Sequence, residues 1–141
     1  MTPLIVGQTT RSQGRTVGEG DVNLFAGLVG DFTPIHVDET FAATTPHGTR
    51  IAHGPLAMSM AIGMSTLSGL FGERVIGLVN LNWDFPGAVK LGDTIHAEVT
   101  VEEVRPSSKP GRAVATYVLK VINQNDTVVQ TGRMVVVIRA E

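Results

Sequence analysis

The segment over residues 56–64 most constrains the fold, because it is apolar on nearly every side of the helix that it would form. Pro55 suits the first turn of such a helix, where its missing N–H would be unpaired in any residue. A helix without a polar face is covered by protein all round. We therefore predict that the chain wraps other elements around one central helix, which starts at Pro55 and is ended by Gly69 and Gly72.

The segments after this helix carry the signals of β-strands. Residues 94–103 alternate apolar and polar side chains with the period of two that is typical of a half-buried strand. Residues 112–122 and 127–138 are rich in Val, Ile, Thr and Tyr and flank a polar turn, and 75–85 forms a further strand. Helices first and a strand meander afterwards predict an α+β fold, with an antiparallel sheet wrapped around the central apolar helix.

The first third of the chain is predicted to be helical and then irregular. A helix is expected over residues 21–29, with Asp21 as its N-cap and Gly30 at its end. Residues 31–53 show little periodicity apart from one helical turn near 39–43, and irregular segments of this length are often functional. Residues 1–141 are expected to form a single domain, long enough to bury a core.

Composition excludes several classes of function. Hydrophobic residues make up 43% of the chain and charged residues 17%, which is typical of a globular protein. The net charge of −2, without a Lys/Arg cluster, argues against a nucleic-acid partner, and the lack of cysteine removes disulfides and thiolate chemistry. The chain start does not resemble a signal peptide, and the apolar segment is too short to span a bilayer. We expect a cytoplasmic protein without a membrane partner.

A carboxylate and an imidazole flank a proline in the irregular segment. Asp31 and His36 would lie roughly 16 Å apart in an extended chain, so they meet only if the chain bends between them. Gly30 and Pro34 permit that bend, because glycine ends a helix in left-handed geometry and proline forces the preceding residue into extended conformation. An acid and an imidazole that meet beside a helix N-terminus suggest general acid–base chemistry at a carbonyl compound.

These motifs occur in a consistent order over almost the whole chain, and together they resemble the MaoC-like dehydratases, or (R)-specific enoyl-CoA hydratases, of the hotdog fold. The resemblance implies reversible addition of water to a trans-2-enoyl-CoA, giving an (R)-3-hydroxyacyl-CoA, by a homodimer or a higher oligomer that uses no cofactor. Thr33 stands where the family usually has Asn, and Pro55 where it has Met. The resemblance rests on Gly30-Asp31-Phe32-Thr33-Pro34-Ile35-His36, Ile51-Ala52-His53-Gly54-Pro55-Leu56, Asn82-Trp83-Asp84-Phe85 and Gly92-Asp93-Thr94.

Three residues are predicted to be catalytic. Asp31 and His36 would share one water, although the sequence does not assign which is the base and which the proton donor. Gly54 would donate its backbone N–H to the thioester oxygen at the positive end of the central helix, because Pro55 has no N–H to offer. The absent side chain of Gly54 permits close approach of that oxygen.

Other polar residues receive weaker predictions. His53, Pro34 and Ser59 are predicted to bind substrate. His53 would also orient the turn, and Ser59 would touch the acyl chain or bond back to its own helix. No metal is expected, because His47 and His53 lack the spacing of a metal motif. His96 should be exposed on a polar strand face. Lys90 and Arg50 are candidate contacts for CoA.

Two alternative functions remain open at this point. A hotdog acyl-CoA thioesterase would carry its carboxylate on the central helix or in the loop before it, but residues 55–67 contain no Asp or Glu. A non-catalytic subunit that binds acyl thioesters would keep the fold, and the Thr33 substitution is the only hint of it.

Overall fold

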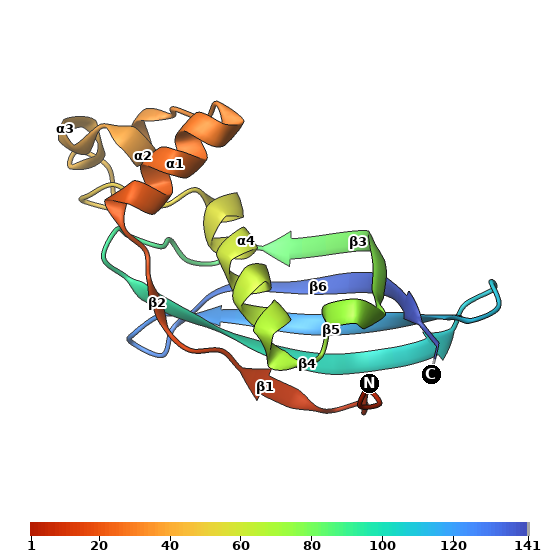
Figure 1. Cartoon of the computed structure of the whole chain (residues 1–141). Coiled ribbons are helices and arrows are strands. Elements are labelled where there is room, and N and C mark those ends of the chain that lie inside the picture. The colour runs from red at the N-terminus through yellow and green to blue at the C-terminus, as the bar shows by residue number, and fades with distance from the viewer. Residues whose placement is uncertain (141) are drawn as a thin grey trace.

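One antiparallel sheet packs against a helix, with three further helices at one end (Figure 1). This is a computed structural model, and it describes residues 1–140. The helices are α1 (Glu19–Val29), α2 (Pro34–Val37), α3 (Glu39–Ala42) and α4 (Gly54–Ser65), with 3-10 turns η1 (Thr66–Ser68) and η2 (Gly72–Arg74). The strands are β1 (Thr9–Arg11), β2 (Arg15–Thr16), β3 (Val75–Asp84), β4 (Thr94–Pro106), β5 (Arg112–Ile122) and β6 (Val128–Arg139).

The strand order differs from the predicted meander. The sheet runs β1-β4-β5-β6-β3, and β2 also pairs with β4. Strands β4, β5 and β6 are consecutive hairpin partners as expected, but β3 pairs antiparallel with β6 and lies at the edge of the sheet. A long connection after β3 carries the chain across to β4, so sequence neighbours are not spatial neighbours here. The predicted α+β class and the antiparallel sheet are confirmed.

Helix α4 is the central helix that the apolar segment predicts, and it lies across one face of the sheet (Figure 1). Its buried side chains join the inward residues of β4 and β5 in the core. The expectation that protein surrounds it on all sides is wrong for a single chain. The sheet covers one side only, and a stripe of small residues spaced four apart stays exposed on the other: Pro55, Ser59 and Gly63.

The helices before α4 differ from the prediction in their details. Helix α1 starts two residues earlier than predicted, at Glu19, and ends at Gly30 in left-handed geometry (φ 77°). Asp21 is not its N-cap, because the carboxylate accepts a hydrogen bond from the Gly18 N–H from inside the first turn. Helix α2 was not predicted. Pro34 opens it, since a proline fits the first turn of a helix as well as it breaks the interior.

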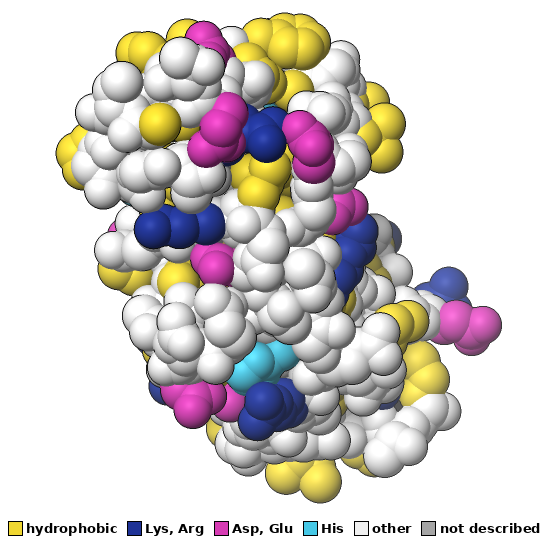
Figure 2. All heavy atoms as spheres, turned by 90° about the vertical axis from the view of Figure 1, so that its left-hand side faces the viewer, with side chains coloured by type: hydrophobic (Ala, Val, Ile, Leu, Met, Phe, Trp, Pro, Cys, Tyr) yellow, Lys and Arg dark blue, Asp and Glu magenta, His cyan; other side chains and the backbone are white. Residues whose placement is uncertain are grey.

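The surface carries both signs of charge. Figure 2 looks at the end of the molecule that bears α1, α2 and α3, and acidic and basic side chains are interspersed there without an extended basic area. Within residues 1–140, none of the helices combines the length and apolarity that crossing a bilayer requires.

Candidate active site

A cavity of about 390 Å³ opens at the N-terminus of α4. It lies where α2 and the segment before α4 meet the connection that follows β3. The backbone of that segment is fixed by a bridge between Ile51 and Lys90 and by the Ala52 N–H, which donates to the Val89 carbonyl at 2.7 Å. The lining residues that bear on function are His36, His47, Gly54, Phe85 and Gln130.

His36 is held in one orientation by a backbone carbonyl. Its side chain is buried, and Nδ1 lies 2.7 Å from the Ile51 oxygen. Because a carbonyl oxygen only accepts hydrogen bonds, Nδ1 carries the proton in the neutral ring. The lone pair is therefore on Nε2, which makes this nitrogen the one that can take a proton from a water.

Thr33 stabilises the ionised form of the Asp31 side chain. Its Oδ1 accepts a hydrogen bond from the Thr33 hydroxyl at 2.6 Å and another from the Thr33 N–H at 3.0 Å. The hydroxyl, followed by the backbone N–H, lowers the pKa of the Asp31 carboxyl below its usual value. The carboxylate is thus charged at neutral pH and can accept a hydrogen bond from water.

The Asp31 and His36 side chains meet, as the bend around Pro34 requires, and His53 joins them. One potential ligand atom of each residue lies within 4.8 Å of those of the other two. The His36 and His53 rings are stacked with centroids 3.9 Å apart. Carbonyl oxygens already occupy one nitrogen of each ring, and Thr33 occupies Oδ1 of Asp31. That a metal is not used here stays a prediction.

His53 is a buried residue that supports Asp31 and His36. Only 1% of it is exposed, so it offers almost no surface for the predicted contact with substrate. Its Nε2 donates to the Asp31 backbone oxygen at 2.9 Å, and Phe25 packs edge-on against the ring. His53 therefore fixes the position of Asp31 and of the stacked His36 ring, which agrees with the expected role in orienting the turn.

Gly54 presents its N–H at the start of α4. Within residues 1–140, no acceptor bonds this N–H, and Pro55 beside it has none to offer. The Phe85 ring packs over the Cα, where an added Cβ would lie 2.9 Å from Cδ1 of the ring. Gln130 donates to the Gly54 carbonyl oxygen at 3.1 Å. The arrangement leaves a free, oriented donor at the positive end of a helix.

Gln130 was not singled out from the sequence, although a signal for it exists. Met134, Val136 and Ile138 face the core from β6, and Gln130 occupies the same even-numbered register. A polar side chain at a core-facing strand position requires buried hydrogen-bond partners. Its partners lie far away in sequence, which is why alternation alone does not identify them.

Two other predicted site residues are not part of this cluster. Ser59 lies on the exposed side of α4 and does not line the cavity beside Gly54. Pro34 is exposed and acts through the backbone, by starting α2 so that His36 points inward. His47, which we did not assign to the site, lines the cavity.

Two expectations, on Arg50 and His96, are also revised. Arg50 is no free contact for CoA, because it forms salt bridges with Glu19 and Glu39, whereas Lys90 is exposed. His96 is only 7% exposed, contrary to the prediction. Its cross-strand partner Ile122 is buried too, so alternation does not mark a solvated face at this end of β4.

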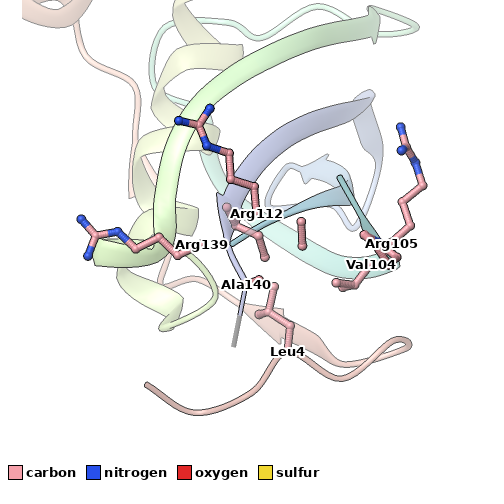
Figure 3. Close-up of a pocket in the computed structure, with 9 residues that line it drawn as sticks. Leu4, Val104, Arg105, Arg112, Arg139 and Ala140 are labelled. Carbon is pink, nitrogen blue, oxygen red and sulfur yellow. The ribbon is translucent and has the colours of Figure 1, made fainter. Parts of the chain in front are cut away.

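A second cavity, of about 310 Å³, lies at the opposite end of the sheet near both termini. Its apolar wall includes Leu4 and Val104. Figure 3 shows the arginines at its rim, Arg105, Arg112 and Arg139, pointing away from one another rather than toward a common centre. Among the described residues, its lining includes no histidine and no carboxylate, whereas His36 lines the cavity at α4 and Asp31 lies next to His36, so the cavity at α4 is the better candidate for chemistry.

The fold and the site define an α+β protein with an acid–imidazole pair at the N-terminus of its central helix. Comparison with known proteins agrees, since the model of the MaoC like domain matches residues 3–123. The chain therefore belongs to the MaoC-like family. It is 37% identical over 124 residues to an (R)-specific enoyl-CoA hydratase of Rhodospirillum rubrum, covering 84% of this chain and 82% of that protein.

Solved structures show the same fold. A protein from Archaeoglobus fulgidus, described as a monoamine oxidase regulatory protein, aligns with a TM-score of 0.90 at 35% identity, covering 98% of this chain and 92% of that one. A Mycobacterium tuberculosis protein described as a double hotdog fold aligns with a TM-score of 0.85 at 25% identity, over 98% of this chain and 43% of its own. The predicted hotdog fold is confirmed.

Proposed function

We propose that this protein adds water reversibly to a trans-2-enoyl-CoA and forms a 3-hydroxyacyl-CoA, without a cofactor. One observation carries the proposal: an ionised carboxylate and an imidazole with a free lone pair lie together beside an unpaired N–H at a helix start. Membership in the MaoC-like family supports it. We propose the R configuration for the product because the Rhodospirillum rubrum relative is named an (R)-specific enoyl-CoA hydratase.

Asp31 and His36 would act on one water. Nε2 of His36 takes one proton as the water oxygen attacks Cβ, and the imidazolium then returns that proton to Cα. Asp31 accepts a hydrogen bond from the second water hydrogen, which stays on the new hydroxyl group. This assignment uses the tautomer of His36 that the Ile51 carbonyl sets and the lowered pKa of Asp31.

Gly54 would stabilise the enolate-like oxygen of the thioester. Negative charge develops on that oxygen when water adds to the conjugated double bond. A backbone N–H that is already oriented, at the positive end of α4, binds this charge more strongly than it binds the neutral carbonyl. Acyl-CoA is thus the proposed partner at this cavity, and the exposed Lys90 beside it is a candidate contact for the CoA part.

We expect a homodimer, or a higher oligomer built from it. Strand β3 is an unpaired sheet edge with large apolar side chains in solvent, of which Leu78 is 55% and Val79 61% exposed. An unpaired apolar edge invites pairing with another strand. The uncovered side of α4 is a second surface that another copy would bury. Light scattering at micromolar concentration should give about twice the chain mass, whereas a monomer of 15.0 kDa would contradict the proposal.

Changing Thr33 to Val should move the titration of the Asp31 carboxyl to higher pH. Valine keeps the shape and the backbone N–H but removes the hydroxyl that contributes most to lowering the Asp31 pKa. The chemical shift of the Asp31 carboxyl carbon, followed by NMR against pH, measures this pKa directly, whereas kcat/KM on acidification also reflects protonation of His36, the proposed base. A titration that does not move would show that the Thr33 hydroxyl does not lower the Asp31 pKa.

Incubation with crotonyl-CoA tests the proposed function directly. The enoyl absorbance should fall, and no free CoA should appear. Release of free thiol would identify a thioesterase, despite the absence of Asp and Glu from α4. If the absorbance stayed constant for several acyl-chain lengths while acyl-CoA bound, the protein would be a binding subunit.

A further inference from the structure

A buried side-chain amide connects the start of α4 to the sheet. Gln130 in β6 is 1% exposed. Its Oε1 accepts a hydrogen bond from the Trp83 indole N–H at 3.0 Å, and its Nε2 donates to the Gly54 carbonyl oxygen at 3.1 Å. An indole nitrogen only donates and a carbonyl only accepts, so these two partners fix which end of the amide is which.

Trp83 gives this amide a rigid anchor. Its ring packs against Gly132, its cross-strand partner in β6, where an added Cβ would lie 1.9 Å from Cε3 of the ring. The ring also packs against both hydrophobic clusters of the core. Glycine at position 132 is thus what allows the indole to reach Gln130.

Gly54 is the residue that most needs such support. Glycine has the fewest steric restraints on its backbone, and the next residue, Pro55, contributes no N–H to the first turn. A bond to the Gly54 carbonyl limits rotation about this backbone, and the Phe85 ring packs on the Cα. The Gly54 N–H lies in the preceding peptide unit, whose His53 carbonyl accepts hydrogen bonds from the next helical turn. Gln130 holds the following peptide unit, so it restrains the angle between the two units at Gly54.

We propose that Gln130 is a positioning residue that holds the Gly54 backbone, through its carbonyl, in the orientation that binds the thioester oxygen. The inference rests on the proposed function, because it gives Gly54 its role there. The inference goes beyond the proposed function, because it makes the hydration rate depend on Gln130 in β6, which touches neither the water nor the Asp31–His36 pair.

Gln130→Met tests this inference, because methionine has a similar length and forms neither hydrogen bond. A misplaced donor should lower kcat for crotonyl-CoA by about 10- to 100-fold, with KM changed by less than about threefold. The matched control is Gln124→Met. Gln124 also makes two amide hydrogen bonds, to Thr94 N–H and Asp93, but neither Gln124 nor its partners line the cavity. Its loss should leave kcat within about twofold.

A second readout does not require activity. In an amide nitrogen–proton correlation spectrum, the Gly54 signal should shift or broaden in Gln130→Met and stay unchanged in Gln124→Met. Equal kcat in the two variants, or an unchanged Gly54 signal in Gln130→Met, would overturn the inference.

If Gln130→Met fails to fold, Gln130→Asn takes its place, because it is too short to bridge both partners. If the unchanged protein does not hydrate crotonyl-CoA, the proposed function is wrong. The Gly54 signal in the two variants still tests whether Gln130 positions the Gly54 backbone.

Discussion

Replacing Asp31 by asparagine, or His36 by asparagine, should each lower the rate of crotonyl-CoA hydration by at least ~100-fold. Both changes are designed to keep the local structure. In Asp31→Asn the new amide oxygen can still accept both hydrogen bonds from Thr33. In His36→Asn the new amide nitrogen can replace Nδ1 as donor to the Ile51 carbonyl. What is lost is the negative charge in one variant and the Nε2 lone pair in the other.

The double variant separates a shared water from independent roles. If Asp31 and His36 act on one water, the double variant should be little slower than the slower single variant, because groups that act as a unit are not additive. Thermal unfolding of all three variants controls for damage to the fold. Single effects that multiplied fully in the double variant would contradict the shared-water mechanism.

Gly54→Pro should have the second-largest effect and remove nearly all turnover. It deletes the N–H, and losing one such donor typically costs on the order of 3 kcal/mol in the transition state. The backbone should accept proline, because the first helical turn suits it and His53 before it already has the extended ψ of 134°. The proline Cβ would meet the Phe85 ring, so the variant is made in a Phe85→Ala background. The rate constant kcat/KM for crotonyl-CoA measures the effect.

Gly54→Ala alone is a poorer control than the sequence suggests, because its Cβ would meet the Phe85 ring. Gly54→Pro and Gly54→Ala are therefore best compared in a Phe85→Ala background, where alanine at position 54 has room and still donates its backbone N–H. Binding of butanoyl-CoA, which has the carbonyl but develops no enolate, measures the ground state. If proline weakened that binding as much as it slowed turnover, Gly54 would be a packing residue and not an oxyanion donor.

Much of the fold could be predicted from local patterns. Strand β5 begins and ends at the predicted residues 112 and 122, because β-branched residues and a clear turn define it. The partner of β3 could not be predicted, since pairing with β6 depends on the long connection and not on any local signal. The exposed side of α4 was missed for a related reason: an apolar helix face indicates burial but not whether the same chain provides the cover.

The site was predicted in part. The bend around Pro34 correctly implied that Asp31 and His36 meet, because proline and glycine restrict the backbone in known ways. The burial of His53 and the anchoring of Gly54 by Gln130 could not be predicted, because each depends on contacts between residues far apart in the chain. The sequence therefore predicted that Asp31 and His36 lie together, but not which residues hold them and Gly54 in place.

A crystal structure with bound butanoyl-CoA would test the central claim most directly, that the cavity at α4 is the site of hydration. The proposal predicts the thioester oxygen about 3 Å from the Gly54 nitrogen. It also predicts a water held by Asp31 and by Nε2 of His36 that faces the acyl Cβ. A thioester group bound elsewhere, for example in the cavity beside Leu4 and Val104 at the other end of the sheet, would contradict it.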